Sequence, residues 1–155
     1  NVFHELKVFI QKRNDVSTVE IDGTETEDSK LVFWAVNNKT LKFDSYFRVM
    51  RDSDFVFCLP GTYWTPRPVE STACGAIPII GDDYLHSYDI PFKDDVNCVI
   101  IRNCKVIKNW SASLDRILTF KDDKIRSMRK NIHDLRKSHL LPIRYVERQR
   151  KRLGL

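Results

Sequence analysis

The sequence predicts an α/β domain built on a parallel sheet, with helices on both faces. Apolar runs at 54–59, 77–80 and 99–101 are continuous rather than alternating, as in strands that a parallel sheet buries on both sides. Segments with helical periodicity alternate with these runs, and that order is typical of the α/β class. A chain of 155 residues is normally one domain, so we expect a single Rossmann-like unit over 1–155.

Four elements are expected before the first of these strands. They are a helix over 2–13, a strand over 16–21, an apolar run over 31–36 that is either strand or helix, and a helix over 41–51. Phe9 and Ile10 belong to the apolar face of the first helix, and the last helix has Phe43, Tyr46 and Met50 on one stripe.

The later elements have clearer boundaries. Pro60 and Gly61 end the strand at 54–59, and Thr65 is placed to cap a helix that has Pro66 at its first position and ends at Gly75. A long loop is expected over 82–97. Helices are predicted at about 111–119 and 122–140, followed by a basic helical segment within 142–155.

Charge is distributed unevenly along the chain. Residues 1–100 hold 10 Lys and Arg against 16 Asp and Glu, a net charge of −6, whereas residues 101–155 hold 16 against 5, a net charge of +11. A basic region can bind nucleic acid, an anionic membrane or a phosphorylated substrate. We favour the solvated face of amphipathic helices, because the charges alternate with apolar residues at helical spacing. No apolar run has the roughly 20 residues needed to cross a bilayer.

The four cysteines show no zinc-binding spacing. Cys58 and Cys74 are predicted to be buried thiols, and Cys98 and Cys104 either pair or stay free. Two N-x-S/T tripeptides, at Asn38 and Asn109, are weak evidence for a secretory compartment. The chain begins without methionine, so we expect a piece or a processed form of a longer protein, cytoplasmic by preference and Golgi-luminal as the alternative.

The candidate site lies where the strand at 54–59 ends and the next helix begins. Ligands of open α/β sheets bind beyond the carboxyl ends of the strands, and a helix N-terminus attracts phosphate. Arg67 adds a forked cation for phosphate oxygens, and Glu70, on the same helical face, offers a carboxylate to adjacent ribose hydroxyls. The pair suits a sugar nucleotide. The alternative is a surface Arg67–Glu70 ion pair worth a few tenths of a kcal/mol.

Several ordered motifs between Tyr46 and Phe92 resemble the exostosin-type glycosyltransferases. They are Ser53, FVFCLPG at 55–61, TPRPVES at 65–71, CGAIPII at 74–80 and IPF at 90–92. The tail from Val99 resembles the end of the same domain. The departures are the adjacent Pro60 and Gly61, Ala76 after Gly75, and Pro68 directly after Arg67, and they bear on donor geometry.

The resemblance implies the C-terminal, donor-binding domain of a twin-Rossmann (GT-B type) enzyme. Such an enzyme would transfer a sugar with inversion from a nucleotide sugar, normally a UDP-sugar, to a glycan acceptor hydroxyl. The acceptor site and the catalytic base would lie in an N-terminal domain that these residues do not include. We therefore expect the isolated domain to bind donor but to be weakly active or inactive, with no cofactor required and Mg²⁺ or Mn²⁺ not favoured.

By position, Arg67 would contact the donor diphosphate and Glu70 the ribose or the sugar. Gly61 would line the approach to the phosphates, and Gly75 would let helix and strand pack closely. Other candidate donor contacts are Thr62, Tyr63, Trp64, Thr65, Asp82, Asp83 and His86. Tyr63 or Trp64 would stack on the base or anchor the core. Asp82 and Asp83 would bind the donor sugar, hold a metal or, most often for such pairs, form a turn, and His86 is more simply an exposed loop residue.

Three other functions remain open at this level. A fucosyltransferase-like enzyme would prefer a GDP-sugar. A basic nucleic-acid-binding module over 102–152 would bind any duplex with a steep dependence on salt. A catalytically inactive interaction domain would bind no nucleotide and would be insensitive to changes at Arg67.

Overall fold

The computed structural model describes residues 5, 8–10, 12–13, 43–58, 65–141, 147–148, 150–151 and 154. Its elements are α2 (Phe43–Asp52), β1 (Phe55–Cys58), α3 (Arg67–Cys74), β2 (Ile77–Gly81), the 3-10 helix η1 (Asp82–Ser87), β3 (Val99–Ile101), α4 (Ile107–Leu118), α5 (Asp122–Leu135) and the π-helix η2 (Arg136–Leu140). The segments expected at 16–21 and 31–36 lie outside the described residues, as do parts of those at 2–13 and 142–155. Residues 5 and 8–10 are helical, as expected.

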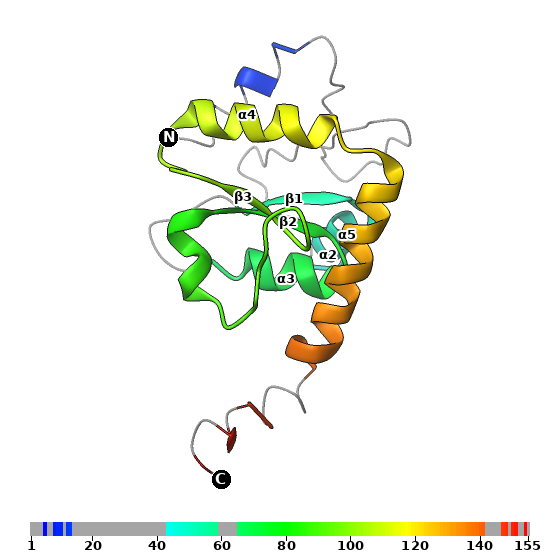
Figure 1. Ribbon diagram of the computed structural model, residues 1–155. Coiled ribbons are helices and arrows are strands. Elements are labelled where there is room, and N and C mark those ends of the chain that lie inside the picture. Colours follow the sequence, from blue (N-terminus) through cyan, green and yellow to red (C-terminus); the bar gives the residue numbers. More distant parts are fainter. Residues whose placement is uncertain are drawn as a thin grey trace.

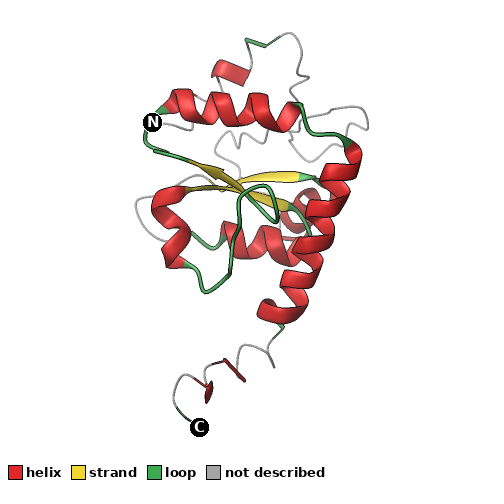
Figure 2. Cartoon of the chain, in the orientation of Figure 1, coloured by secondary structure: helices red, strands yellow, loops and turns green. Residues whose placement is uncertain are grey.

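The three strands form one parallel sheet in the order β1-β2-β3, which confirms the predicted α/β class (Figure 1). Phe55 pairs with Ile77 and Cys58 with Ile80, and Ile80 in turn pairs with Ile100. Figure 2 shows the helices arranged around these strands. Because the strands are parallel, their carboxyl ends all reach the same edge of the sheet.

Helices cover the two faces of the sheet: α4 lies on one side and α3 on the other (Figure 1). Alternate strand residues supply the two cores. On the α4 side the core contains Ile77, Ile79, Val99, Ile101, Trp110, Leu114 and Ile117. On the α3 side it contains Cys58, Ile80, Cys98 and Ile100. Residues Met128, Ile132 and Leu135 of α5 join the larger core, so α5 also anchors to the sheet.

Some boundaries differ from the expectation. Helix α4 begins at Ile107 rather than near 111, because Trp110 is fully buried and its Nε1 donates to the Cys104 carbonyl at 2.7 Å. The helix expected over 122–140 is α5 followed by the wider turn of η2. The loop expected over 82–97 begins with the helical turns of η1.

Gly75 has a different role from the one expected. A Cβ built at Gly75 would meet nothing within 4 Å, so this glycine is not needed for close packing of helix and strand. Its φ of 86° lies in the left-handed region. The Gly75 N–H donates to the Thr72 carbonyl and the Ala76 N–H to the Ser71 carbonyl, which is a Schellman motif. Gly75 therefore ends α3 through its backbone conformation.

Candidate functional site

The candidate site occupies the sheet edge at which the strands end. Helix α3 follows β1 through residues 59–64, which lie outside the described part of the chain and include Gly61, Thr62, Tyr63 and Trp64. The predicted contacts of these four residues are therefore not placed. Arg67 and Glu70 are both half-buried in the first turn of α3.

The main chain at the start of α3 has fewer free donors than a helix N-terminus normally offers. Pro66 and Pro68 have no N–H, and the N–H groups of Val69 and Glu70 donate to the Pro66 carbonyl at 2.9 and 3.0 Å. The Arg67 N–H makes a long contact of 3.4 Å with Thr65 Oγ1. The predicted cap at Thr65 is wrong by one residue, because α3 begins at Arg67 with Pro66 as its N-cap and without a side-chain cap. The expected cradle of unpaired N–H groups is thus reduced to the Arg67 amide, and attraction of an anion depends mainly on the Arg67 side chain.

Glu70 is held by a tyrosine from the neighbouring helix. Tyr46 of α2 donates its hydroxyl hydrogen bond to Glu70 Oε2 at 2.7 Å. Burial raises the pKa of Tyr46 well above its usual value of 10.0, and the Glu70 carboxylate raises it further, while the positive charge of Arg67 and its side-chain hydrogen bond with the phenol act in the opposite direction. The phenol, the carboxylate and the guanidinium therefore form one local group.

Arg67 and Glu70 do not form the surface ion pair that was the alternative. Among the residues that the structure describes, neither side chain makes an ion pair within 4.0 Å. Glu70 is instead bonded to Tyr46 through one oxygen. The cation and the carboxylate lie one helical turn apart, and both interact with the Tyr46 phenol.

A second tyrosine fixes the residue that precedes this turn. Tyr88, buried in the segment after η1, donates its hydroxyl to the Thr65 carbonyl at 2.8 Å. Its ring lies edge-on to Phe92 at 6.2 Å between centroids. The segment that follows β2 thereby holds the main chain just before α3, although Tyr88 and Thr65 are 23 residues apart in the sequence.

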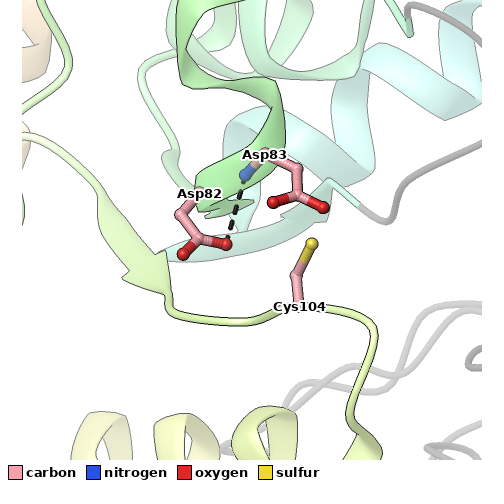
Figure 3. Close-up of side chains that lie close together, drawn as sticks. All are labelled: Asp82, Asp83 and Cys104. Carbon is pink, nitrogen blue, oxygen red and sulfur yellow. Dashed lines mark hydrogen bonds between the residues drawn. The ribbon is translucent and has the colours of Figure 1, made fainter.

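Asp82 and Asp83 lie where β2 ends, beside Cys104 (Figure 3). One oxygen of Asp82 accepts from the Asp83 N–H at 3.1 Å and the other from the Asn103 N–H at 3.0 Å. Asp83 faces Lys105 at 3.5 Å. These contacts join the turn after β2 to the turn after β3, which supports the interpretation of the two acids as turn residues.

Cys104 was not expected in this group, since 21 residues separate it from Asp83. One ligand atom from each of Asp82, Asp83 and Cys104 lies within 4.8 Å of the others, a spacing suited to a metal ion. Burial raises the pKa of the Cys104 thiol, and the two carboxylates raise it further. The hydrogen bonds that Asp82 accepts from two main-chain N–H groups, and the contact of Asp83 with Lys105, explain the group as a polar turn.

The remaining predicted residues are placed as follows. All four cysteines are free, so of the two alternatives left open for Cys98 and Cys104 the structure shows the unpaired one. Cys58 is buried as expected, whereas Cys74 is only half-buried. His86 is exposed on η1.

Asn109, one of the two N-x-S/T asparagines, lies in the first turn of α4. Its side-chain nitrogen donates to the Arg102 and Asn103 carbonyls at 2.9 and 3.1 Å. The amide that a glycan would modify is thus used within the folded chain. Asn38 lies outside the described residues.

Two open grooves lie away from Arg67 and Glu70. One, of about 570 Å³, is lined by Asp54, Asp122, Ile125, Arg126 and Arg129 near the amino end of β1. The other, of about 320 Å³, lies beside β3 and α4 and is lined by Asp94, Ile100, Arg102, Asn103, Asn109, Ala112, Ser113 and Arg116. Arg116 makes a two-pronged contact with Asp94, and Arg129 pairs with Asp54, so their charges are partly neutralised internally.

No protein-family model, curated protein or solved structure matches the chain. None of the helices in the described part has the length and apolarity required to span a membrane. What the geometry offers is a half-buried arginine and a positioned glutamate, one turn apart, beside the carboxyl end of a parallel sheet.

Proposed function

We propose that this chain is the nucleotide-sugar-binding domain of an exostosin-like glycosyltransferase that transfers a sugar, with inversion, from a UDP-sugar to a glycan hydroxyl. One observation carries the proposal: Arg67 and Glu70 begin α3 at the ligand-binding edge of a parallel sheet without pairing with each other. The order of the motifs between Tyr46 and Phe92, which resembles that of the exostosin-type glycosyltransferases, is the reason for proposing this family.

In this function each side chain has a distinct task. The Arg67 guanidinium offers forked donors to the diphosphate. Glu70 accepts hydrogen bonds from ribose hydroxyls through the oxygen that Tyr46 does not use. Asp82 and Asp83 border the same edge and are candidates for contacts with the donor sugar.

The catalytic base and the acceptor site belong, in this proposal, to an N-terminal domain that completes the twin-Rossmann enzyme. The described residues would then bind donor but turn it over slowly or not at all. No resident cofactor is required in this proposal, in which Arg67 supplies a positive charge to the diphosphate. The partners are the nucleotide sugar, the glycan acceptor and the N-terminal domain.

The test is calorimetric titration of the 155-residue chain with UDP, GDP and ADP, repeated on Arg67→Ala and on Arg126→Ala. Arg126 of α5 is a matched control, because its side chain is exposed and lies 3.8 Å from Asp122 of the same helix. We expect saturable UDP binding that weakens at least tenfold in Arg67→Ala, since hydrogen bonds to charged groups contribute about 1.5–3 kcal/mol, and that is unchanged in Arg126→Ala.

Other outcomes would change the conclusion. Preference for GDP would favour the fucosyltransferase-like alternative. Absence of saturable binding to every nucleotide by folded protein would contradict the donor-domain proposal. Duplex DNA added to the same samples should show no steep, salt-dependent binding, and finding it would favour the nucleic-acid-binding alternative.

A further inference from the structure

We propose that Tyr46 is a positioning residue that turns the free oxygen of Glu70 toward the ribose hydroxyls, and that it thereby sets a preference for nucleotides with an intact ribose. The inference rests on the proposed function, because it concerns how the same site recognises the sugar of its nucleotide. It adds a residue of α2 to a site otherwise built from α3.

The hydrogen bond has the geometry of a strong one. Its length of 2.7 Å is typical of a hydroxyl donating to a carboxylate, and both side chains are half-buried. Helices α2 and α3 pack against each other, so the phenol approaches Glu70 from a fixed support. The Tyr46 ring is also edge-on to Phe47, at 5.2 Å between centroids and 82° between planes.

The Tyr46 phenol is the donor of this hydrogen bond. Burial and the neighbouring carboxylate raise the pKa of Tyr46, so the phenol keeps the proton that it donates. A carboxylate with one oxygen held by a donor loses the freedom to rotate about its terminal bond. Glu70 Oε2 is therefore committed to Tyr46, and Oε1 is presented in one orientation.

Two adjacent hydroxyls are the natural ligands for such an oxygen. In the part of the chain that the structure describes, Glu70 Oε1 makes no hydrogen bond, and Arg67 lies one turn earlier on the same face. A nucleotide that places its diphosphate at Arg67 brings its ribose to the next turn. Removing the Tyr46 hydroxyl frees the carboxylate to reorient, which weakens recognition of ribose more than of phosphate, even though the Arg67 side chain also interacts with the phenol.

The experiment compares Tyr46→Phe with the unchanged chain, using UDP and 2′,3′-dideoxyuridine diphosphate as calorimetric ligands. The unchanged chain should prefer UDP by tenfold or more. Tyr46→Phe should lose about tenfold in affinity for UDP and less than twofold for the dideoxy ligand, so that the preference nearly disappears. Glu70→Gln should lose the same preference, and adding Tyr46→Phe to it should change the ratio no further.

Failure of this inference is distinguishable from failure of the proposed function. If Tyr46→Phe keeps the preference for UDP while Glu70→Gln loses it, Tyr46 has only a structural role and the inference is overturned. The inference also falls if Tyr46→Phe lowers both affinities equally. If the unchanged chain binds neither ligand, the proposed function falls, and the inference that depends on it falls too.

Discussion

The cysteines of this chain differ in burial, and therefore in the pKa of their thiols. Cys58 and Cys98 lie inside the core on the α3 side of the sheet, and burial raises the pKa of each to about 12. Cys74, at the end of α3, is half-buried and lies near Arg51 and Arg136, whose charges act against the burial that raises its pKa.

A thiol reagent should therefore distinguish these cysteines. At pH 8 a thiol with a pKa of about 12 is ionised in about one molecule in ten thousand, and only the thiolate reacts. We expect native protein to be labelled first at Cys74, with Cys58 and Cys98 protected until unfolding. Mass spectrometry of peptides after a timed pulse measures this, and denatured protein is the control that should label at all four positions. Rapid native labelling of Cys58 would contradict the described core.

Single residues also show what could not be read from the sequence. Tyr46 was predicted only as one member of an apolar stripe, because nothing in local periodicity points to a carboxylate 24 residues away. The meeting of Asp83 with Cys104 depends in the same way on the pairing of β2 with β3. The loss of N–H donors at Pro66 and Pro68, by contrast, was readable, because proline lacks that donor wherever it stands.

At the scale of elements, prediction succeeded where a pattern was continuous and failed where a tertiary contact set the boundary. The strands at Ile77–Gly81 and Val99–Ile101 lie where uninterrupted apolar runs placed them. The start of α4 was placed too late, because the bond from Trp110 to the Cys104 carbonyl extends the helix to residues that lack a side-chain cap. Residues 82–87 were called loop because a short 3-10 helix has little periodicity of its own.

The end of α3 gives a prediction at the same scale. Gly75→Ala should lower the free energy of unfolding by about 1–2 kcal/mol, because a side chain in the left-handed region is strained even though the added Cβ has open space. Gly75→Asn is the matched variant and should cost less, since asparagine tolerates that region better. Urea unfolding of the three proteins measures the difference. Equal stability of Gly75→Ala and the unchanged chain would contradict the described helix end.

On the scale of the whole molecule, one basic side chain connects distant parts of the fold. Arg148 donates to the Ser138 and His139 carbonyls at 3.0 and 2.7 Å, where η2 ends, and its Nε lies 3.7 Å from Asp89. Asp89 follows Tyr88, which holds the Thr65 carbonyl. Arg148 of the basic C-terminal region is thus used within the folded chain, a role that the interpretation as a solvated helical face did not include.

Arg148→Ala should therefore lower the stability of the fold and loosen the segment that contains Asp89. We expect a loss of about 1–3 kcal/mol in the free energy of unfolding, the usual range for hydrogen bonds to a charged group, with faster amide exchange over 82–97. Arg148→Lys should recover only part of the loss, because an ammonium cannot contact both carbonyls through a planar fork. Hydrogen exchange read by mass spectrometry gives both results. Arg126→Ala, at an exposed position, is the control and should change neither.

The strand order β1-β2-β3 has a consequence for how this chain is made. Each described strand pairs with the strand that immediately precedes or follows it, so none has to enter between two strands already joined. As the polypeptide leaves the ribosome, β2 can dock on β1 as soon as α3 has emerged, and β3 can then dock on β2. Because synthesis proceeds from the N-terminus, the described strands emerge in the order in which they pair. The edge of each strand therefore stays unpaired only until the next strand has been synthesised.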